Sequence, residues 1–382
     1  MSFLKEEWKK ILLFIAVFVI VYFLPVGNLR FNNALINSIS MLNNYFREHF
    51  LLGLFPAMFI AGAITVFLKS SEVIKYMGDK SNKIIAYCFA SVSGFLLSVC
   101  SCTVMPLFAG IYRMGAGLGP AVTFLFAAPA INLVAITMTT SVLGIKMGLA
   151  RTLTAVLFSF LAGIIMAFLF RKEEVKRIQN IAAACESGSA AKPAYVNGMF
   201  FMSMIALLVF LNWHHKNFLI VTVGIIAAAT LVFVLLKYFK KDDYSVWMVS
   251  TFEYIKRQMP LLAIGILASG FLLGFEGKDG LIPSSWISSA VGGNGLLANF
   301  ISSFLGSFMY FCTLIEVPIV QGFMNNGMGQ GPALALLLSG PALSLPNMLL
   351  IRSVMGTKKT AAYVSIVIIL ASVTGYVFGN YF

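Results

Sequence analysis

The sequence predicts an all-α, polytopic membrane protein with about 9–11 hydrophobic segments in two inverted repeats, each containing a re-entrant or broken helix. Three observations support this fold class. Of the 382 residues, 59% are hydrophobic and only 11% are charged, against about 25% charged in an average globular protein. The apolar residues gather in runs close to the roughly 20 residues that a helix needs to cross a bilayer. Glycine, proline and cysteine also recur at one fixed offset along the chain.

The apolar segments follow one another along the whole chain, separated by short polar stretches. In chain order they lie near residues 11–25, 50–68, 84–109, 118–142, 147–170, 197–212, 218–238, 259–275, 296–320, 331–352 and 361–381. The first segment has a basic head, and residues 25–28 are a poor cleavage site, so we expect a retained signal anchor and not a cleaved signal peptide. The short alternating segments typical of an outer-membrane barrel are missing.

One polar stretch, residues 171–194, is the clearest linker and divides the chain into two halves. We expect an N-terminal anchor and loop over 1–45 and a first repeat over 46–170. Two linking helices over 195–240 and a second repeat over 241–382 follow the linker.

The two halves match at an offset of 212 residues without a gap. The aligned pairs are Gly94 and Gly306, Cys100 and Cys312, Pro106 and Pro318, Gly119 and Gly331, Pro129 and Pro341, and Gly144 and Gly356. Chance does not place so many glycines and prolines at one offset, so this is an internal repeat. Many transporter folds are built from such repeats.

The net charge of +13 comes from basic residues in loops between apolar runs, which indicates a membrane topology and not nucleic-acid binding. Most of these residues fall on the cytoplasmic side if that side holds the N-terminus and residues 69–83, 171–192, 237–257 and 352–359. Lys146 and Arg151 then lie outside. Segments 84–142 and 295–351 must each cross an odd number of times although each has two apolar runs. One run in each is therefore re-entrant or broken, and the repeats are inverted.

Both of these segments contain helix-breaking residues beside polar side chains. Broken backbone inside a membrane is tolerated where it is buried in protein or lines a wet cavity, and paired breaks in two halves indicate a transporter's binding site. Half-helix N-termini at Pro129 and Pro341 would favour an anion. We expect a substrate site that includes Pro106, Pro129, Asn132, Pro318, Pro341, Ser344 and Asn347. Alternatively, these prolines and glycines only kink the helices for packing.

Glu316 is the only acidic residue between Asp279 and the C-terminus. A carboxylate in the middle of a membrane is costly and usually marks a solute pathway or a proton relay. We therefore expect Glu316 to contribute to the substrate site and to couple protons. The alternative is a structural pair with a cation or a backbone amide.

Cys100 and Cys102 are separated by one residue, and Cys312 occupies the repeat-equivalent position of Cys100. Thiolates are soft ligands that suit thiophilic species, and the three sulfurs converge if the inverted repeats meet at the bilayer midplane. Alternatively, C-x-C occurs by accident and buried cysteine behaves as a small hydrophobe.

Motifs for catalysis are missing from the sequence. There is no G-x-x-x-x-G-K-[ST], no H-E-x-x-H and no G-x-S-x-G. A nucleophilic cysteine would need a nearby base, and none is evident. We therefore expect neither an enzyme nor a bound cofactor or resident metal.

Residues 100–106 (CSCTVMP) and 124–132 (FLFAAPAIN) resemble the signature of the predicted permease family of ArsP-like and YraQ-like proteins. Residues 339–347 (SGPALSLPN) are similar to the second-half signature of that family. The resemblance covers almost the whole chain after about residue 45 and implies a multi-pass permease of the inner (plasma) membrane. Members with known activity export trivalent organoarsenicals such as methylarsenite, and by position the implied thiols are Cys100 and Cys102.

Together, the residues and the resemblance predict a secondary permease for a small solute, embedded in the lipid bilayer. Efflux of a thiophilic species such as a trivalent organoarsenical is the first candidate. The alternatives are a permease for a sulfur-containing or other small anionic metabolite, and an intramembrane thiol redox protein. No nucleic-acid partner is expected, and a homo-oligomer is left open.

Overall fold

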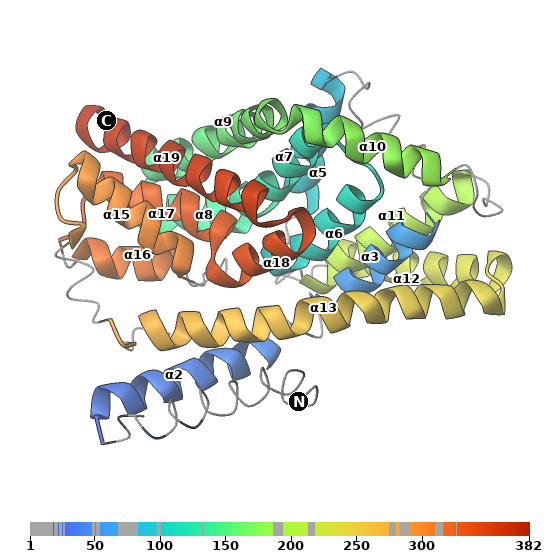
Figure 1. Ribbon diagram of the computed structural model, residues 1–382, viewed down its shortest axis with the longest axis horizontal. Helices are drawn as coiled ribbons and strands as arrows, with labels where there is room; N and C mark the ends of the chain where they lie inside the picture. The colour runs from blue at the N-terminus through green and yellow to red at the C-terminus, as the bar shows by residue number, and fades with distance from the viewer. Residues whose placement is uncertain are drawn as a thin grey trace, which may run out of the picture.

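The computed structural model (Figure 1) describes residues 18, 22, 25, 27–47, 50, 54–67, 83–97, 101–131, 133–185, 194–212, 218–274, 280–282, 290–309, 316–325 and 327–382. Within these residues the regular elements are all helices, which confirms the predicted all-α class. The helices are α2 (Leu29–Tyr45), α3 (Phe55–Phe67), α5 (Lys83–Leu97), α6 (Ser101–Arg113), α7 (Leu118–Ala130), α8 (Leu133–Leu143), α9 (Ile145–Leu169), α10 (Arg171–Cys185), α11 (Ala194–Asn212), α12 (Phe218–Tyr238), α13 (Lys241–Leu273), α15 (Leu296–Phe308), α16 (Glu316–Asn325), α17 (Gln330–Leu343), α18 (Leu345–Met355) and α19 (Thr357–Tyr381).

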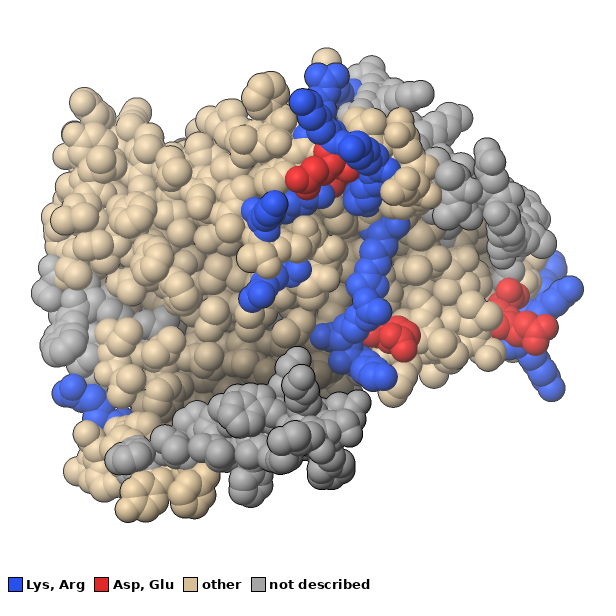
Figure 2. Space-filling model, in the orientation of Figure 1, with Lys and Arg blue, Asp and Glu red and all other residues tan. Residues whose placement is uncertain are grey.

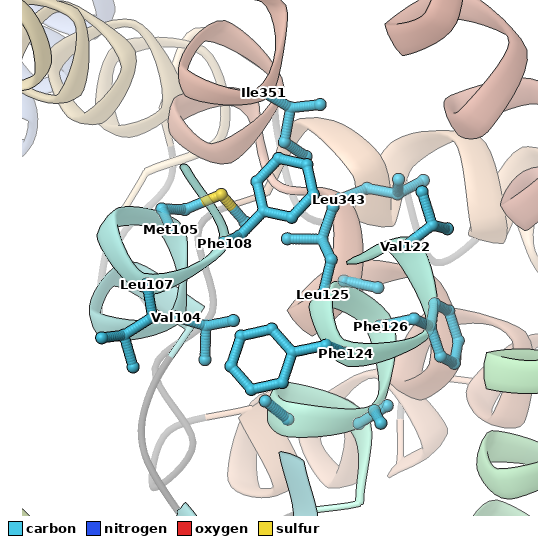
Figure 3. Close-up of a cluster of buried hydrophobic side chains, with 14 of the residues drawn as sticks. Val104, Met105, Leu107, Phe108, Val122, Phe124, Leu125, Phe126, Leu343 and Ile351 are labelled. Carbon is cyan, nitrogen blue, oxygen red and sulfur yellow. The ribbon is translucent and has the colours of Figure 1, made fainter. Parts of the chain in front are cut away.

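The centre of the molecule is formed by α7 and α17, in which every residue from the second helical position onward is buried. Both helices are largely apolar on all sides, and a helix of this kind must be covered on all sides. α5 and α9 pack against α7, and α15 and α19 pack in the same way against α17. Figure 3 shows Phe124 of α7 pointing toward Val104 of α6, while Leu343 and Ile351 bring the second half into the same cluster.

The backbone repeats with the sequence. α9 and α19 each have 25 residues, and their first residues, Ile145 and Thr357, are 212 positions apart. The glycine before each helix has a positive φ, 96° at Gly144 and 83° at Gly356. This region of backbone conformation is strained for residues with a side chain, so the same backbone requirement explains why glycine recurs at this offset.

Small residues let the paired helices approach closely in both halves. A Cβ built on Gly375 of α19 would lie 2.6 Å from the backbone oxygen of Gly331 in α17, and one built on Gly163 of α9 would lie 2.7 Å from that of Gly119 in α7. Real Cβ atoms do not come this close to backbone, so both helix pairs depend on glycine. Close backbone approach at small residues is a common way for membrane helices to associate.

The equivalent helices α9 and α19 lie side by side and run antiparallel. At one end, Nζ of Lys146 in α9 lies 3.5 Å from the backbone oxygen of Phe382, just after α19. At the other end, Lys359 of α19 lies over the ring of Phe170, just after α9. Figure 1 shows the two helices together along one edge of the molecule, with α13 and α2 along the opposite edge.

Four of the described helices are long and apolar enough to cross a membrane: Ile145–Leu169, Val221–Tyr238, Lys241–Leu272 and Thr357–Tyr381. The number rises to six if each of two bent helix pairs forms one span. In the pair α7 and α8, and again in the pair α17 and α18, the axis bends by 46°. The predicted broken helix is therefore present in each repeat.

Residues 171–185 of the expected polar linker form helix α10, because their charged residues are good helix formers. Two sequence expectations differ from the structure. The expected basic loop 237–257 is largely the first half of α13, which continues through Pro260 into the next apolar run. Within the expected N-terminal loop, α2 buries residues spaced three and four apart against α13. The expected signal anchor over 11–25 lies almost wholly outside the described residues.

Candidate functional site

A buried ion pair joins the two halves. Glu316 is the first residue of α16, and Arg151 lies in the second turn of α9. Arg151 Nη2 donates a hydrogen bond to Glu316 Oε1, and Arg151 Nη1 donates to Thr139 Oγ1 over 2.7 Å. Arg151 is 0% exposed and Glu316 is 1% exposed. Arginine and glutamate are almost never buried to this extent unless they are paired.

Thr139, which binds Arg151, is itself fixed by a hydrogen bond to the backbone. Thr139 Oγ1 donates to the backbone oxygen of Ala135 over 2.6 Å, which leaves its lone pairs to accept from Arg151. Thr139 lies in α8, the second arm of a bent pair, and α8 packs against both α9 and α16. The ion pair therefore connects the broken helix of the first repeat to the second repeat.

Two polar atoms of the ion pair form no hydrogen bond with any described residue. Among the described residues, neither Arg151 Nε nor Glu316 Oε2 has a partner. An unsatisfied buried polar group costs about 1–3 kcal/mol, so such atoms call for an explanation, which is often an ordered water or another group. A solute entering this region would find one donor and one acceptor that no described residue occupies.

Further buried polar atoms without a partner among the described residues lie at the bend between α17 and α18. Ser344 lies at the bend, and Asn347 lies in the first turn of α18. Asn347 is 0% exposed, and neither its amide nitrogen nor its amide oxygen has a partner within the described part of the chain; the same holds for Ser344 Oγ. No hydrogen bond between described residues connects these two side chains to Glu316.

The prolines that the sequence assigns to the site lie in helices. Pro106, Pro129 and Pro341 are buried inside α6, α7 and α17, whereas Pro318 is exposed in the first turn of α16. The expected half-helix N-termini at Pro129 and Pro341 are wrong. Both prolines lie in the last turn of the first arm, and the second arms begin at Leu133 and Leu345.

The sulfur site is only partly within the described structure. Cys102 lies at the beginning of α6, with its backbone described and its side chain not. Cys100, Cys312 and Asn132 lie outside the described residues, so the convergence of three sulfurs stays a prediction. Within the described residues, no group of three or more His, Cys, Asp or Glu side chains could hold a metal ion.

Arg151 was missed as a site residue, because the expected topology placed it in an outside loop. The structure corrects this, since its side chain is buried among α8, α9 and α16. A usable signal was present in the sequence. Arg151 falls within the apolar run 147–170, and a buried carboxylate at Glu316 needs a cation.

The ion pair breaks the symmetry of the repeat. At an offset of 212 residues, Arg151 corresponds to Tyr363 and Glu316 to Val104. Thr139 likewise corresponds to Ile351. Tyr363 is 0% exposed, and its hydroxyl has no partner among the described residues, while Val104 and Ile351 belong to the apolar cluster of Figure 3. Charged side chains are thus found at only one of the two positions that the repeat makes equivalent.

A second charged cluster joins helix α10 to both halves. The Glu174 carboxylate accepts hydrogen bonds from Tyr112 Oη over 2.8 Å, from Arg177 Nε over 2.9 Å and from Lys359 Nζ. Arg177 also lies over the ring of Tyr112 at 3.8 Å and donates to its backbone oxygen. Figure 2 shows Lys and Arg side chains gathered over α10 and the beginning of α19, whereas the face over α15 carries none.

Burial alone would raise the pKa of the Glu174 carboxyl. The neighbouring Arg177 charge and the hydrogen bonds from Lys359, Arg177 and Tyr112 outweigh burial and hold this pKa below its ordinary value of 4.5. Glu174 is therefore a carboxylate at neutral pH, and it fixes α10 to α6 and α19.

Comparison with known proteins finds relatives that match nearly the whole chain. A family model described as a predicted permease matches residues 34–380. The UPF0718 protein MJ0584 of Methanocaldococcus jannaschii is 39% identical over 363 residues, which cover 91% of this chain and 95% of that protein. The UPF0718 protein YraQ of Escherichia coli K12 is 32% identical over 100 residues, 26% of this chain and 25% of that protein. No solved structure matches.

The region matched by the family model includes both bent helix pairs and both partners of the buried ion pair. Several of the helices in this region have the length and composition of membrane spans. The protein is a multi-pass membrane protein, and its chain belongs to the predicted permease family.

Proposed function

We propose that this protein is a secondary permease that moves a small solute past the Arg151–Glu316 ion pair, with Glu316 as the proton-coupling group. One observation carries the proposal: a fully buried ion pair links the two repeats, yet Nε and Oε2 have no partner within the described residues. Ionisable residues inside membranes are rare and mark solute pathways and proton relays. A purely structural pair would be expected to satisfy its remaining polar atoms.

Protonation of Glu316 supplies the coupling step. The neutral carboxylic acid attracts the Arg151 guanidinium far less, and the guanidinium keeps its charge, as arginine side chains do in proteins. Its donors can then bind an entering anion. Loss of the proton restores the ion pair and releases the anion. The empty site and the site holding both proton and anion are each electrically neutral, which is the condition for a low-cost buried state.

Two features of the fold support alternating access between inverted repeats. α9 and α19 run antiparallel, and the two halves exchange equivalent contacts, α16 with α8 and α6 with α18. Inverted repeats that rock against each other around a fixed midplane site are a common design of secondary transporters. We place α10 and its basic surface in the cytoplasm, because Lys and Arg gather on that side of the plasma membrane.

Two cargo classes rest on different residues. A small anion, including a sulfur-containing metabolite, is favoured by the buried Arg151 guanidinium, which binds planar anions through several donors. A thiophilic species such as a trivalent organoarsenical is favoured by Cys100, Cys102 and Cys312, because thiolates are soft ligands. The second class also has the support of the family resemblance.

Uptake into proteoliposomes tests the proposal. The solutes are methylarsenite, arsenite, Cu(I), Zn(II) and thiosulfate, each with and without a pH gradient. The wild type is compared with Glu316→Gln and with Glu253→Gln, a control carboxylate in α13 whose side chain is 54% exposed. We expect the gradient to stimulate uptake of one solute class by the wild type and the control but not by Glu316→Gln. Uptake no faster than in empty vesicles for every solute would contradict the proposal.

Further variants separate the cargo classes. Cys100→Ser with Cys102→Ser should abolish transport of a thiophilic cargo and leave thiosulfate uptake intact. Arg151→Met with Glu316→Leu should abolish thiosulfate uptake. For a thiophilic cargo, the same double variant should lose stimulation by the pH gradient and keep the uptake measured without a gradient. A trapped Cys100–Cys102 disulfide in a protein that moves no solute would support the thiol redox alternative and overturn the permease proposal.

A further inference from the structure

A groove of about 470 Å³ opens at one end of the first repeat. It lies where the N-terminal ends of α5 and α7 meet the C-terminal end of α9 and the beginning of α10. Tyr87, Gly119 and Ala167 line its inner part. Because α9 has the length and composition of a membrane span, a groove at its end lies at the boundary between hydrocarbon and water.

Two exposed cations, Lys83 and Arg171, line this groove. Lys83 begins α5 and Arg171 begins α10, both are exposed, and neither forms a salt bridge with any described residue. Glu174 also lines the groove, but its carboxylate is already bound by Lys359 and Arg177. Counted over the described residues, the unpaired charge of the groove is therefore positive.

The outer wall of the groove is apolar and exposed. Ile84 is 75% exposed, Ile164 is 52% exposed and Phe168 is 80% exposed. In a membrane such side chains face acyl chains, so the groove has a basic part at the water boundary and an apolar part along the lipid. A soluble anion would use only the first of these parts.

The geometry points to a binding groove for one anionic phospholipid, with its phosphodiester at Lys83 and Arg171 and its acyl chains along Ile84, Ile164 and Phe168. Basic pockets between membrane helices on the cytoplasmic side bind anionic lipid headgroups, and the volume of this groove lies in the range of ordinary ligand sites. The inference does not depend on the proposed transport, since it concerns a different end of α9 from the end that holds Arg151.

Native mass spectrometry of the detergent-purified protein tests this site. The probes are phosphatidylglycerol and phosphatidylcholine with the same acyl chains. The test variant is Lys83→Glu with Arg171→Glu. The matched control is Lys172→Glu with Lys358→Glu, which makes the same change in net charge at exposed residues outside the groove. Circular dichroism of each variant checks that it is folded.

We expect the wild type and the control to retain one phosphatidylglycerol in preference to phosphatidylcholine. Charge reversal in the groove should weaken phosphatidylglycerol binding about tenfold or more, since each basic residue near an anionic headgroup contributes a several-fold gain. Equal weakening in the control would show that lipid binding depends only on the net charge of the protein, and it would overturn the proposed site. Displacement of the lipid by inorganic phosphate would also overturn it.

A second measurement locates the acyl chains. Phe168→Trp places a fluorophore in the groove, and Leu157→Trp places one on the same helix at a residue that is 55% exposed and outside the groove. In phosphatidylcholine nanodiscs with a minor fraction of brominated phosphatidylglycerol, we expect stronger quenching at Phe168→Trp, measured against the unsubstituted protein. Equal quenching at the two positions would show only bulk lipid contact and would contradict the groove.

Discussion

Removal of one partner of the buried ion pair should destabilise the protein far more than removal of both. The side chains of Arg151 and Glu316 are 0% and 2% exposed, so water cannot screen the charge that a single substitution leaves behind. Breaking a buried pair in this way costs about 3–5 kcal/mol, whereas replacing both partners with apolar residues of similar volume is often neutral or stabilising by about 1–4 kcal/mol. Arg151→Met should therefore lower the free energy of unfolding by about 3–5 kcal/mol. Arg151→Met with Glu316→Leu should recover most of this loss.

Reversible unfolding in mixed SDS–detergent micelles, followed by circular dichroism, measures these differences. The matched control is the exposed pair of Arg257 and Glu253 in α13, whose charged atoms are 3.9 Å apart and whose side chains are 63% and 54% exposed. Substitution of either control residue should change stability by less than about 1 kcal/mol. If Arg151→Met costs no more than Arg257→Met, the ion pair is not buried and the proposed site is refuted.

Other consequences can be measured in the same assay. Thr139→Val leaves the Arg151 Nη1 donor without its acceptor and should lower the free energy of unfolding by about 1–3 kcal/mol. Thr139→Ser should keep most of the stability. Equal stabilities of the two variants would contradict the hydrogen bond. Gly375→Ala places a Cβ 2.6 Å from a backbone oxygen of α17 and should cost about 1–3 kcal/mol, whereas Gly198→Ala, with nothing within 4 Å, should be neutral or better. The pKa of Glu174 is lower in the folded protein than in the unfolded chain, so its contribution is complete above about pH 4.5 and is lost as the pH falls toward the folded value. The stability difference between the wild type and Glu174→Gln should shrink below about pH 4.5, and a difference that stays constant there would contradict the cluster.

The repeat could be predicted from the sequence because its marker residues perform backbone tasks. Gly144 and Gly356 each adopt a positive φ before a 25-residue helix, and Gly163 and Gly375 each admit a close neighbour. No other residue type does this without strain or displacement. Glycines that recur at an offset of 212 residues therefore indicated that the two halves have equivalent backbone structures.

The positions of the helix breaks were predicted less well. Proline was expected to start the second arm of each broken helix, yet Pro129 and Pro341 lie in the last turn of the first arm. Proline removes a single backbone donor, and a helix buried on all sides keeps its other hydrogen bonds. The chain therefore turns two to three residues later, at Ile131 and at Ser344.

The sequence indicated that a buried Glu316 needs a cation but not which residue supplies it, because the partners of the ion pair are 165 residues apart and lie in different repeats. Glu316 stood out by its isolation, whereas Arg151, near the beginning of an apolar run, resembled the end of a loop. The same tertiary dependence hid the role of α10. Its Glu174 needs Tyr112 and Lys359, which come from two other helices.

Proton-coupled exchange in proteoliposomes tests the central claim most directly. For the solute that the uptake screen identifies, two fluxes are compared between the wild type and Glu316→Gln: uptake driven by a pH gradient, and equal exchange of labelled for unlabelled solute without a gradient. We predict that Glu316→Gln loses gradient-driven uptake and keeps exchange, because its neutral side chain mimics the protonated state. Gradient-driven uptake by Glu316→Gln at the wild-type rate would contradict the role of Glu316 in coupling.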